Sequence, residues 1–119
     1  MEARMVAHAI HHEITSRNIE ILLRRYTLTD QSTITGRFKR SIEFCYSLSD
    51  IDQEILFEII RQSAVDTAST VLGIIEGSVI PKGIKNEFSL SYGNEEIGYS
   101  LQSEFLNVEE KHWLSRDAG

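Results

Sequence analysis

The sequence has few of the residues that hold small folds together covalently or through metals. Its 119 residues include one cysteine, Cys45, and one proline, Pro81. A single thiol cannot form an internal disulfide, and no CxxC or paired Cys/His spacing is present to build a zinc cage. No apolar run reaches the roughly 18 to 20 residues that cross a bilayer, and the first residues lack the apolar core of a secretory signal. We therefore expect a cytoplasmic protein of one domain, residues 1–119, stabilised by an ordinary hydrophobic core.

Signatures of catalysis are missing as well. The sequence contains no GxSxG, no glycine-rich phosphate loop and no GxGxxG. Cys45 stands between Phe44 and Tyr46, an apolar setting in which a thiol is usually an inert packing residue. We expect a protein that binds rather than catalyses, with no cofactor.

Charge is distributed unevenly along the chain. Residues 1–40 contain seven Lys/Arg and four Asp/Glu, whereas residues 41–119 contain five and fourteen, for a net charge of −6. This negative field repels phosphate backbones and favours a basic protein partner, which argues against nucleic acid as a ligand. The lack of a membrane-spanning apolar run argues against a membrane partner. The basic N-terminal residues could form a small RNA patch, but a solvated helix face accounts for them more simply. They are Arg17, Arg24, Arg25, Arg37, Lys39 and Arg40, with Tyr26 and Phe38 among them.

The clearest structural pattern is a long helix over about residues 50–76. Ser49 stands three residues before Asp52, as an N-cap does, and acidic residues follow at the positive end of the helix dipole. Gly77 stands where helices often end in a left-handed glycine. Apolar residues keep a 3.6-residue period between these ends and nearly surround the C-terminal half. We expect this helix to be the central, buried element.

The remaining segments predict further helices and one hairpin. Residues 1–14 and 19–26 have helical spacing, as two helices or one continuous helix, and the pattern breaks over 28–36. Residues 37–48 fit a helix or a strand, and we favour the helix. Apolar residues alternate on both sides of a Gly-Asn turn within residues 87–101, which predicts an antiparallel β-hairpin, and a short terminal helix follows.

The predicted fold class is therefore α+β: a helical cluster around the helix 50–76, with the hairpin 87–101 packed on it. A two-stranded sheet is marginal in water by itself. We expect the hairpin either to lie on the long helix through Phe88, Leu90, Ile97 and Tyr99 or to form a homodimer through its free edge.

Asp66 is the carboxylate that the helical pattern singles out. It lies on the helix flank shared with Ile55 and Ile59, where the sequence becomes apolar. A buried carboxylate needs hydrogen-bond donors, such as Thr67, Thr70 or a distant arginine. We expect a partly buried, architectural Asp66 whose replacement by alanine costs about 2 to 4 kcal/mol. The alternative is a catalytic carboxylate.

A histidine cluster near the N-terminus is the weak candidate for a metal site. It has the pattern HxxHH and consists of His8, His11 and His12. On a helix His8 and His12 lie one turn apart, a spacing at which two imidazoles can chelate one ion. Glu13 does not stand between two histidines as in zincins, and His112 is far away in the sequence. We favour a polar helix face. The alternative function is a small metal-dependent enzyme using His8, His12 and either Glu13 or Asp66.

One resemblance rests on the end of the long helix and the segments around it. The run DTASTVLGIIEG at 66–77 follows an LFEII turn at 56–60 and precedes FSL at 88–90 and LQSEF at 101–105. Over residues 37–110 this succession resembles small uncharacterised bacterial proteins of an immunity-like type. The resemblance implies a domain that neutralises a toxin by binding it, without a catalytic residue.

Composition, charge and this resemblance together predict a non-enzymatic protein-binding domain, of the kind represented by immunity-type inhibitors. We expect it to offer an acidic surface to a basic partner. The residues of that predicted surface are Glu87, Glu95, Glu96, Glu104, Glu109 and Glu110.

Overall fold

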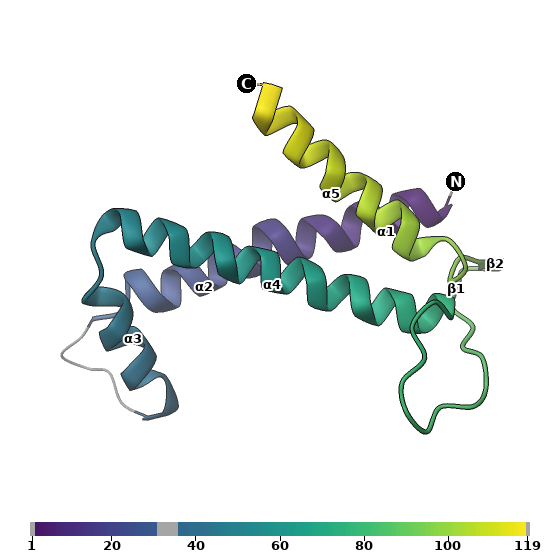
Figure 1. Ribbon diagram of the computed structural model, residues 1–119, viewed down its shortest axis with the longest axis horizontal. Helices are drawn as coiled ribbons and strands as arrows, with labels where there is room; N and C mark the ends of the chain where they lie inside the picture. Colours follow the sequence, from purple (N-terminus) through teal and green to yellow (C-terminus); the bar gives the residue numbers. More distant parts are fainter. Residues whose placement is uncertain (1, 31–35, 119) are drawn as a thin grey trace.

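The structure is a computed structural model that describes residues 2–30 and 36–118. The chain is mostly helical, with a long central helix and one small antiparallel hairpin (Figure 1). Part of the predicted break at 28–36 lies outside the described residues. The elements are α1 (Glu2–His12), a π-helical turn (Glu13–Arg17), α2 (Asn18–Thr27), a 3-10 turn (Gly36–Phe38), α3 (Lys39–Tyr46), α4 (Asp50–Glu76), β1 (Ser91–Tyr92), β2 (Glu95–Glu96) and α5 (Leu101–Ala118).

The N-terminal segment is one continuous helix that contains a single wide turn. The N–H of Asn18 donates to the carbonyl of Glu13, a spacing of five residues that defines the π-helical turn between α1 and α2. Figure 1 shows α4 crossing this helix, with α2 and α3 near the start of α4 and the hairpin near its end. The continuous alternative is therefore confirmed over the described residues 2–26.

The ends of α4 lie where the capping residues predict. The Ser49 hydroxyl accepts the N–H of Asp52 over 3.1 Å, and Gly77 ends the helix in a left-handed conformation with φ 96°. α3 confirms the helical interpretation of residues 37–48. It is joined to its neighbours by the Tyr46 hydroxyl, 2.6 Å from the Thr29 carbonyl, and by the side-chain amide of Gln53, which donates to the Cys45 carbonyl over 2.7 Å.

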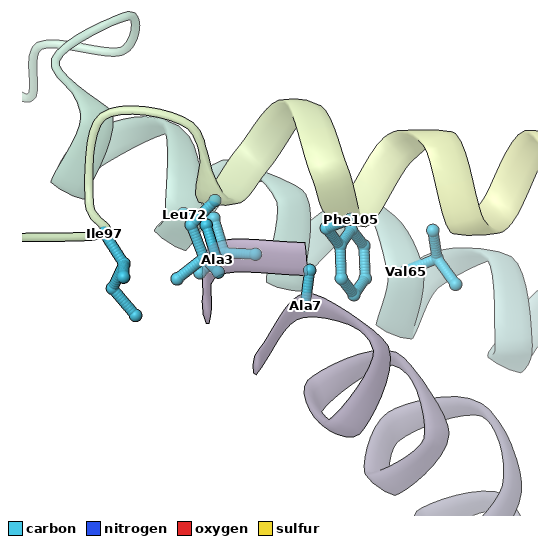
Figure 2. Close-up of a cluster of buried hydrophobic side chains, with 7 residues drawn as sticks. Ala3, Ala7, Val65, Leu72, Ile97 and Phe105 are labelled. Carbon is cyan, nitrogen blue, oxygen red and sulfur yellow. The ribbon is translucent and has the colours of Figure 1, made fainter. Parts of the chain in front are cut away.

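The main hydrophobic core lies between α1, the C-terminal half of α4 and α5. Figure 2 shows its side chains, with the Phe105 ring directed from α5 towards the neighbouring helices. Its members are Ala3, Ala7, Val65, Leu72, Ile97, Leu101 and Phe105. The two alanines allow α1 to lie close to α5, and Ile97 fixes the end of the hairpin to this core.

The hairpin is much shorter than predicted. Only Ser91 and Tyr92 pair with Glu96 and Glu95, around a two-residue turn in which Gly93 has φ 60°. The predicted second strand does not extend to residue 101, because β2 ends at Glu96 and α5 begins at Leu101. The hairpin contacts the core through Ile97, with Leu90 packed against it, whereas Phe88 and Tyr99 are exposed.

Within residues 2–30 and 36–118, no helix is long and apolar enough to cross a membrane.

Candidate functional site

A buried polar cluster joins α1, α4 and α5 around the carboxylate of Glu109. Arg61 donates to both carboxylate oxygens through its two terminal nitrogens, over 2.8 and 2.9 Å. His11 Nε2 and Trp113 Nε1 each donate over 2.8 Å. Glu109 is 7% exposed, so four donors replace the water that this carboxylate has lost.

These contacts determine the ionisation of the cluster. Burial raises the pKa of Glu109, but hydrogen bonds from Arg61, His11 and Trp113, together with the charge of Arg61, outweigh it and lower the pKa to about 2. Nearby, burial and the charge of Arg61 lower the pKa of His112. Glu109 is thus ionised at neutral pH, and each of its oxygens already accepts two hydrogen bonds from neighbouring helices or its own, which gives it a structural role at their junction.

Sequence reasoning missed this cluster, although a signal for it existed. His11 continues the i, i+4 row of Ala3 and Ala7, and Glu109 continues that of Leu101 and Phe105. Each row is apolar and buried until it reaches one polar residue, the position at which a polar group requires a partner inside the fold.

The structure brings four histidines to one open groove of about 440 Å³. Its lining includes His8, His11, His12 and His112. The fold therefore brings His112 close to the other three histidines, although it is about 100 residues away from them in the sequence. His11 is already engaged with Glu109. Among the described residues, no group of three or more His, Cys, Asp or Glu side chains is arranged to hold a metal ion.

A second cavity, of about 560 Å³, lies at the C-terminal end of α4. The connector 77–90 leaves α4 as a wide loop and returns to β1 (Figure 1), and the cavity lies between it and the helix end. Its walls combine apolar side chains, among them Ile75, Ile80 and Phe88, with carboxylates. We call this cavity the acidic pocket; three carboxylates, those of Glu76, Glu87 and Glu96, and one amine, that of Lys85, line it.

The three carboxylates of the acidic pocket are in different states. Glu96 accepts the Ser89 hydroxyl and, over 3.0 Å, the Gly98 N–H. The bond from Ser89 in particular lowers the pKa of Glu96, which is therefore ionised at neutral pH. Glu76 Oε2 is buried, and no donor in the described part of the chain contacts it. Glu76 thus lines the pocket and has one carboxylate oxygen, covered by protein atoms, that lacks a donor among the described residues.

The predicted acidic surface is divided by the fold. Glu87, Glu95 and Glu110 are exposed, and Glu87 and Glu96 line the acidic pocket. Glu104 lies 3.4 Å from Arg4 in a pair between α5 and α1. Glu109 is buried in the three-helix cluster, so it cannot present its charge to a partner.

The prediction that Asp66 is partly buried is wrong, because its side chain is exposed. It does lie on the flank of Ile55 and Ile59, but all three are exposed, because the packed side of α4 contains Val65 and Leu72 instead. One Asp66 oxygen accepts the side-chain amide of Gln62 over 2.9 Å. Asp66 is a solvated side chain on a helix that is only half buried.

Several of the basic N-terminal residues interact with acidic or aromatic side chains of the same N-terminal segment. Arg24 and Glu20 form a pair one helical turn apart, at 3.0 Å. The guanidinium groups of Arg25 and Arg37 lie 4.5 and 4.8 Å from the centre of the Phe38 ring. This arrangement agrees with a solvated helix face.

Cys45 is buried, and burial raises the pKa of its thiol.

Comparisons with protein-family models, curated proteins and solved structures find no match for this chain. The resemblance over residues 37–110 therefore stays a prediction. The acidic pocket is the candidate functional site, because it combines a cavity, apolar walls and an unsatisfied acceptor.

Proposed function

We propose that this chain is a protein-binding domain that captures a basic partner through the acidic pocket, in the manner of an immunity-type inhibitor. The observation that carries the proposal is the buried Glu76 Oε2, which has no donor among the described residues. A buried acceptor without a donor costs about 1 to 3 kcal/mol, and a ligand in the pocket removes that cost when the Glu76 carboxylate turns this oxygen towards it.

The pocket suits a cationic side chain with an aliphatic stem, above all arginine or lysine. The stem of such a residue packs on apolar surface while its head reaches a carboxylate. Ile80 and Phe88 provide exposed apolar surface, and the carboxylates of Glu76, Glu87 and Glu96 outnumber the single amine of Lys85 in the lining. The C-terminal end of α4 adds the negative pole of a helix dipole, and its last turn contains no basic residue.

A peptide with one arginine between two leucines, acetylated and amidated, is the probe that tests this proposal. Heteronuclear NMR of the labelled protein should reveal amide shifts confined to the end of α4 and the connector 77–90. Glu76→Gln should weaken the binding, whereas Glu110→Gln, the same change at an exposed site outside the pocket, should leave it unchanged.

Two further comparisons separate a cation site from a generally adhesive pocket. Replacing the arginine of the probe by norleucine should abolish the shifts, and raising the salt from about 50 to about 500 mM should weaken the binding. Equal shifts with both peptides, or shifts spread over other helices, would contradict the proposed function.

A further inference from the structure

The open groove of about 440 Å³ between α1 and α5 is lined by every histidine of this chain, four in all. On each of these helices the lining residues stand at positions i, i+3 and i+4, which share one helix face. They are His8, His11 and His12 on α1, and Val108, Lys111 and His112 on α5. The turn after α1 adds Ser16, and α4 adds Arg61. We call this site the histidine groove.

Carboxylates are absent from the lining of the histidine groove, as far as the described residues extend. The chain as a whole has 18 Asp and Glu against 12 Lys and Arg, so this local composition is the reverse of the average. One helical turn earlier the same two faces meet in an ion pair, Arg4 with Glu104. Glu110 follows Val108 by two residues and therefore lies on the opposite side of α5. The wall of the groove thus offers donors without an anionic side chain to occupy them.

Several of these donors have no partner inside the protein. Among the described residues, no acceptor contacts the side chains of His12, Ser16 or Lys111. Arg61 uses two of its five N–H donors on Glu109. Lys111 is exposed and supplies a full positive charge. Since the donors belong to three different helices and a turn, they can meet a ligand from several directions.

The charges around His112 show that these surroundings are positive. Burial lowers the pKa of His112 most. The charges of Arg61, Arg116 and His11 lower it further, and the charge of Glu109 raises it. Positive charges that disfavour a protonated imidazole favour an anion at the same place.

The net charge of −6 acts only weakly on the histidine groove. Among the carboxylates of the acidic pocket, Glu76 follows Arg61 by fifteen residues on α4. This is about 22 Å along the helix, whereas exposed charges in physiological salt are screened over about 8 Å. The local donors therefore determine which ligand the groove accepts.

We infer that the histidine groove binds a phosphate group, either as the free ion or as the monoester of a small molecule. A phosphate monoester carries about two negative charges and three strong acceptor oxygens, so it suits donors that approach from several directions. A lysine such as Lys111 binds phosphate as a point charge. The groove volume of about 440 Å³ lies within the roughly 300 to 1000 Å³ of small-molecule sites, which leaves room for an organic group beside the phosphate.

This inference does not rest on the acidic pocket. The pocket lies at the C-terminal end of α4 and attracts cations, whereas the histidine groove lies beside Arg61 and attracts anions. Either site can therefore be present without the other.

Titration of the ¹⁵N-labelled full chain with inorganic phosphate, followed through its imidazole signals, tests the inference. All four imidazoles line the groove, so these signals report on it directly. At neutral pH we expect saturable shifts with a Kd of about 1 mM or tighter. Lys111→Gln should weaken the binding about tenfold, because it removes a charged donor. Lys82→Gln, the same change at an exposed lysine of the connector 77–90, is the matched control and should bind like the parent.

Glycerol 2-phosphate is the second probe and distinguishes the two sources of a phosphate group. Tighter binding than that of inorganic phosphate identifies a monoester as the ligand, and equal or weaker binding identifies the free ion. Sodium chloride and sodium acetate at the same ionic strength should produce no saturable shift.

Three results would overturn the inference. They are the absence of saturable shifts up to about 10 mM phosphate, equal shifts with chloride or acetate, and equal weakening by Lys111→Gln and Lys82→Gln. Circular dichroism of each variant checks that its helices persist. His12→Gln removes one imidazole donor and should also weaken the binding, so it provides a second variant should Lys111→Gln lose its helices.

Discussion

Replacing Glu109 by glutamine removes the charge at the junction of three helices and leaves the shape of the side chain nearly unchanged. The interactions in the fold lower the pKa of this carboxyl from 4.5 to about 2. At 1.36 kcal/mol for each pKa unit, the ionised carboxylate stabilises the fold by about 3 kcal/mol. This agrees with the cost of about 3 to 5 kcal/mol for breaking a buried ion pair, which here leaves Arg61 with an uncompensated charge.

The stabilisation depends on pH in a defined direction. A carboxyl whose pKa is lowered by folding contributes its full stability above its unfolded pKa, here about 4.5, and loses it as the pH falls towards about 2. We expect Glu109→Gln to be less stable than the parent by about 3 kcal/mol at neutral pH, and this difference to shrink towards zero near pH 2. In melting temperature, 3 kcal/mol corresponds to roughly 12 °C for a chain of this length.

Urea unfolding followed by circular dichroism, at equal protein concentration and at several pH values, measures this difference. Glu110→Gln is the matched control, since it makes the same change one residue later at an exposed position. The reasoning is refuted if both variants unfold like the parent at neutral pH, or if the deficit of Glu109→Gln is the same at acidic and neutral pH.

Three further substitutions test local features by the same unfolding assay. Gly73→Ala should destabilise by about 1 to 3 kcal/mol, although alanine normally favours helices, because its Cβ would lie 2.9 Å from a Val79 methyl group and 2.6 Å from the Gln102 side-chain nitrogen, which would lose its bond to the Ser69 carbonyl on moving away; unchanged or increased stability would contradict this close packing. Ser49→Ala should cost about 1 kcal/mol by removing the N-cap of α4, and no loss would mean that the cap is dispensable. Asp66→Ala should change stability by less than about 0.5 kcal/mol, since Asp66 is exposed, and a loss above about 2 kcal/mol would restore its predicted burial.

The acidic pocket illustrates how far a sequence can be interpreted without its fold. An acidic C-terminal region and a basic partner could be predicted from charge alone. Charge alone could not predict which carboxylates share a cavity. Glu76 and Glu96 are twenty residues apart in the sequence, and the path of the connector 77–90 brings them to the same cavity. Charge counts likewise cannot distinguish the exposed Glu110 from the buried Glu109 beside it.

Local signals in the sequence determined the helices, because capping and apolar periodicity act within a few residues. Ser49, Gly77 and the spacing between them were sufficient to place α4 at 50–76, and residues 37–48 could be assigned to a helix. Only the tertiary structure decided which side of each helix is covered. Asp66, Ile55 and Ile59 share an apolar-looking flank that the chain leaves exposed, whereas His11, Arg61 and Glu109 come from three distant segments and meet inside. Burial depends on which helices pack together, and that choice rests on contacts between residues as many as 100 positions apart, which no local pattern encodes.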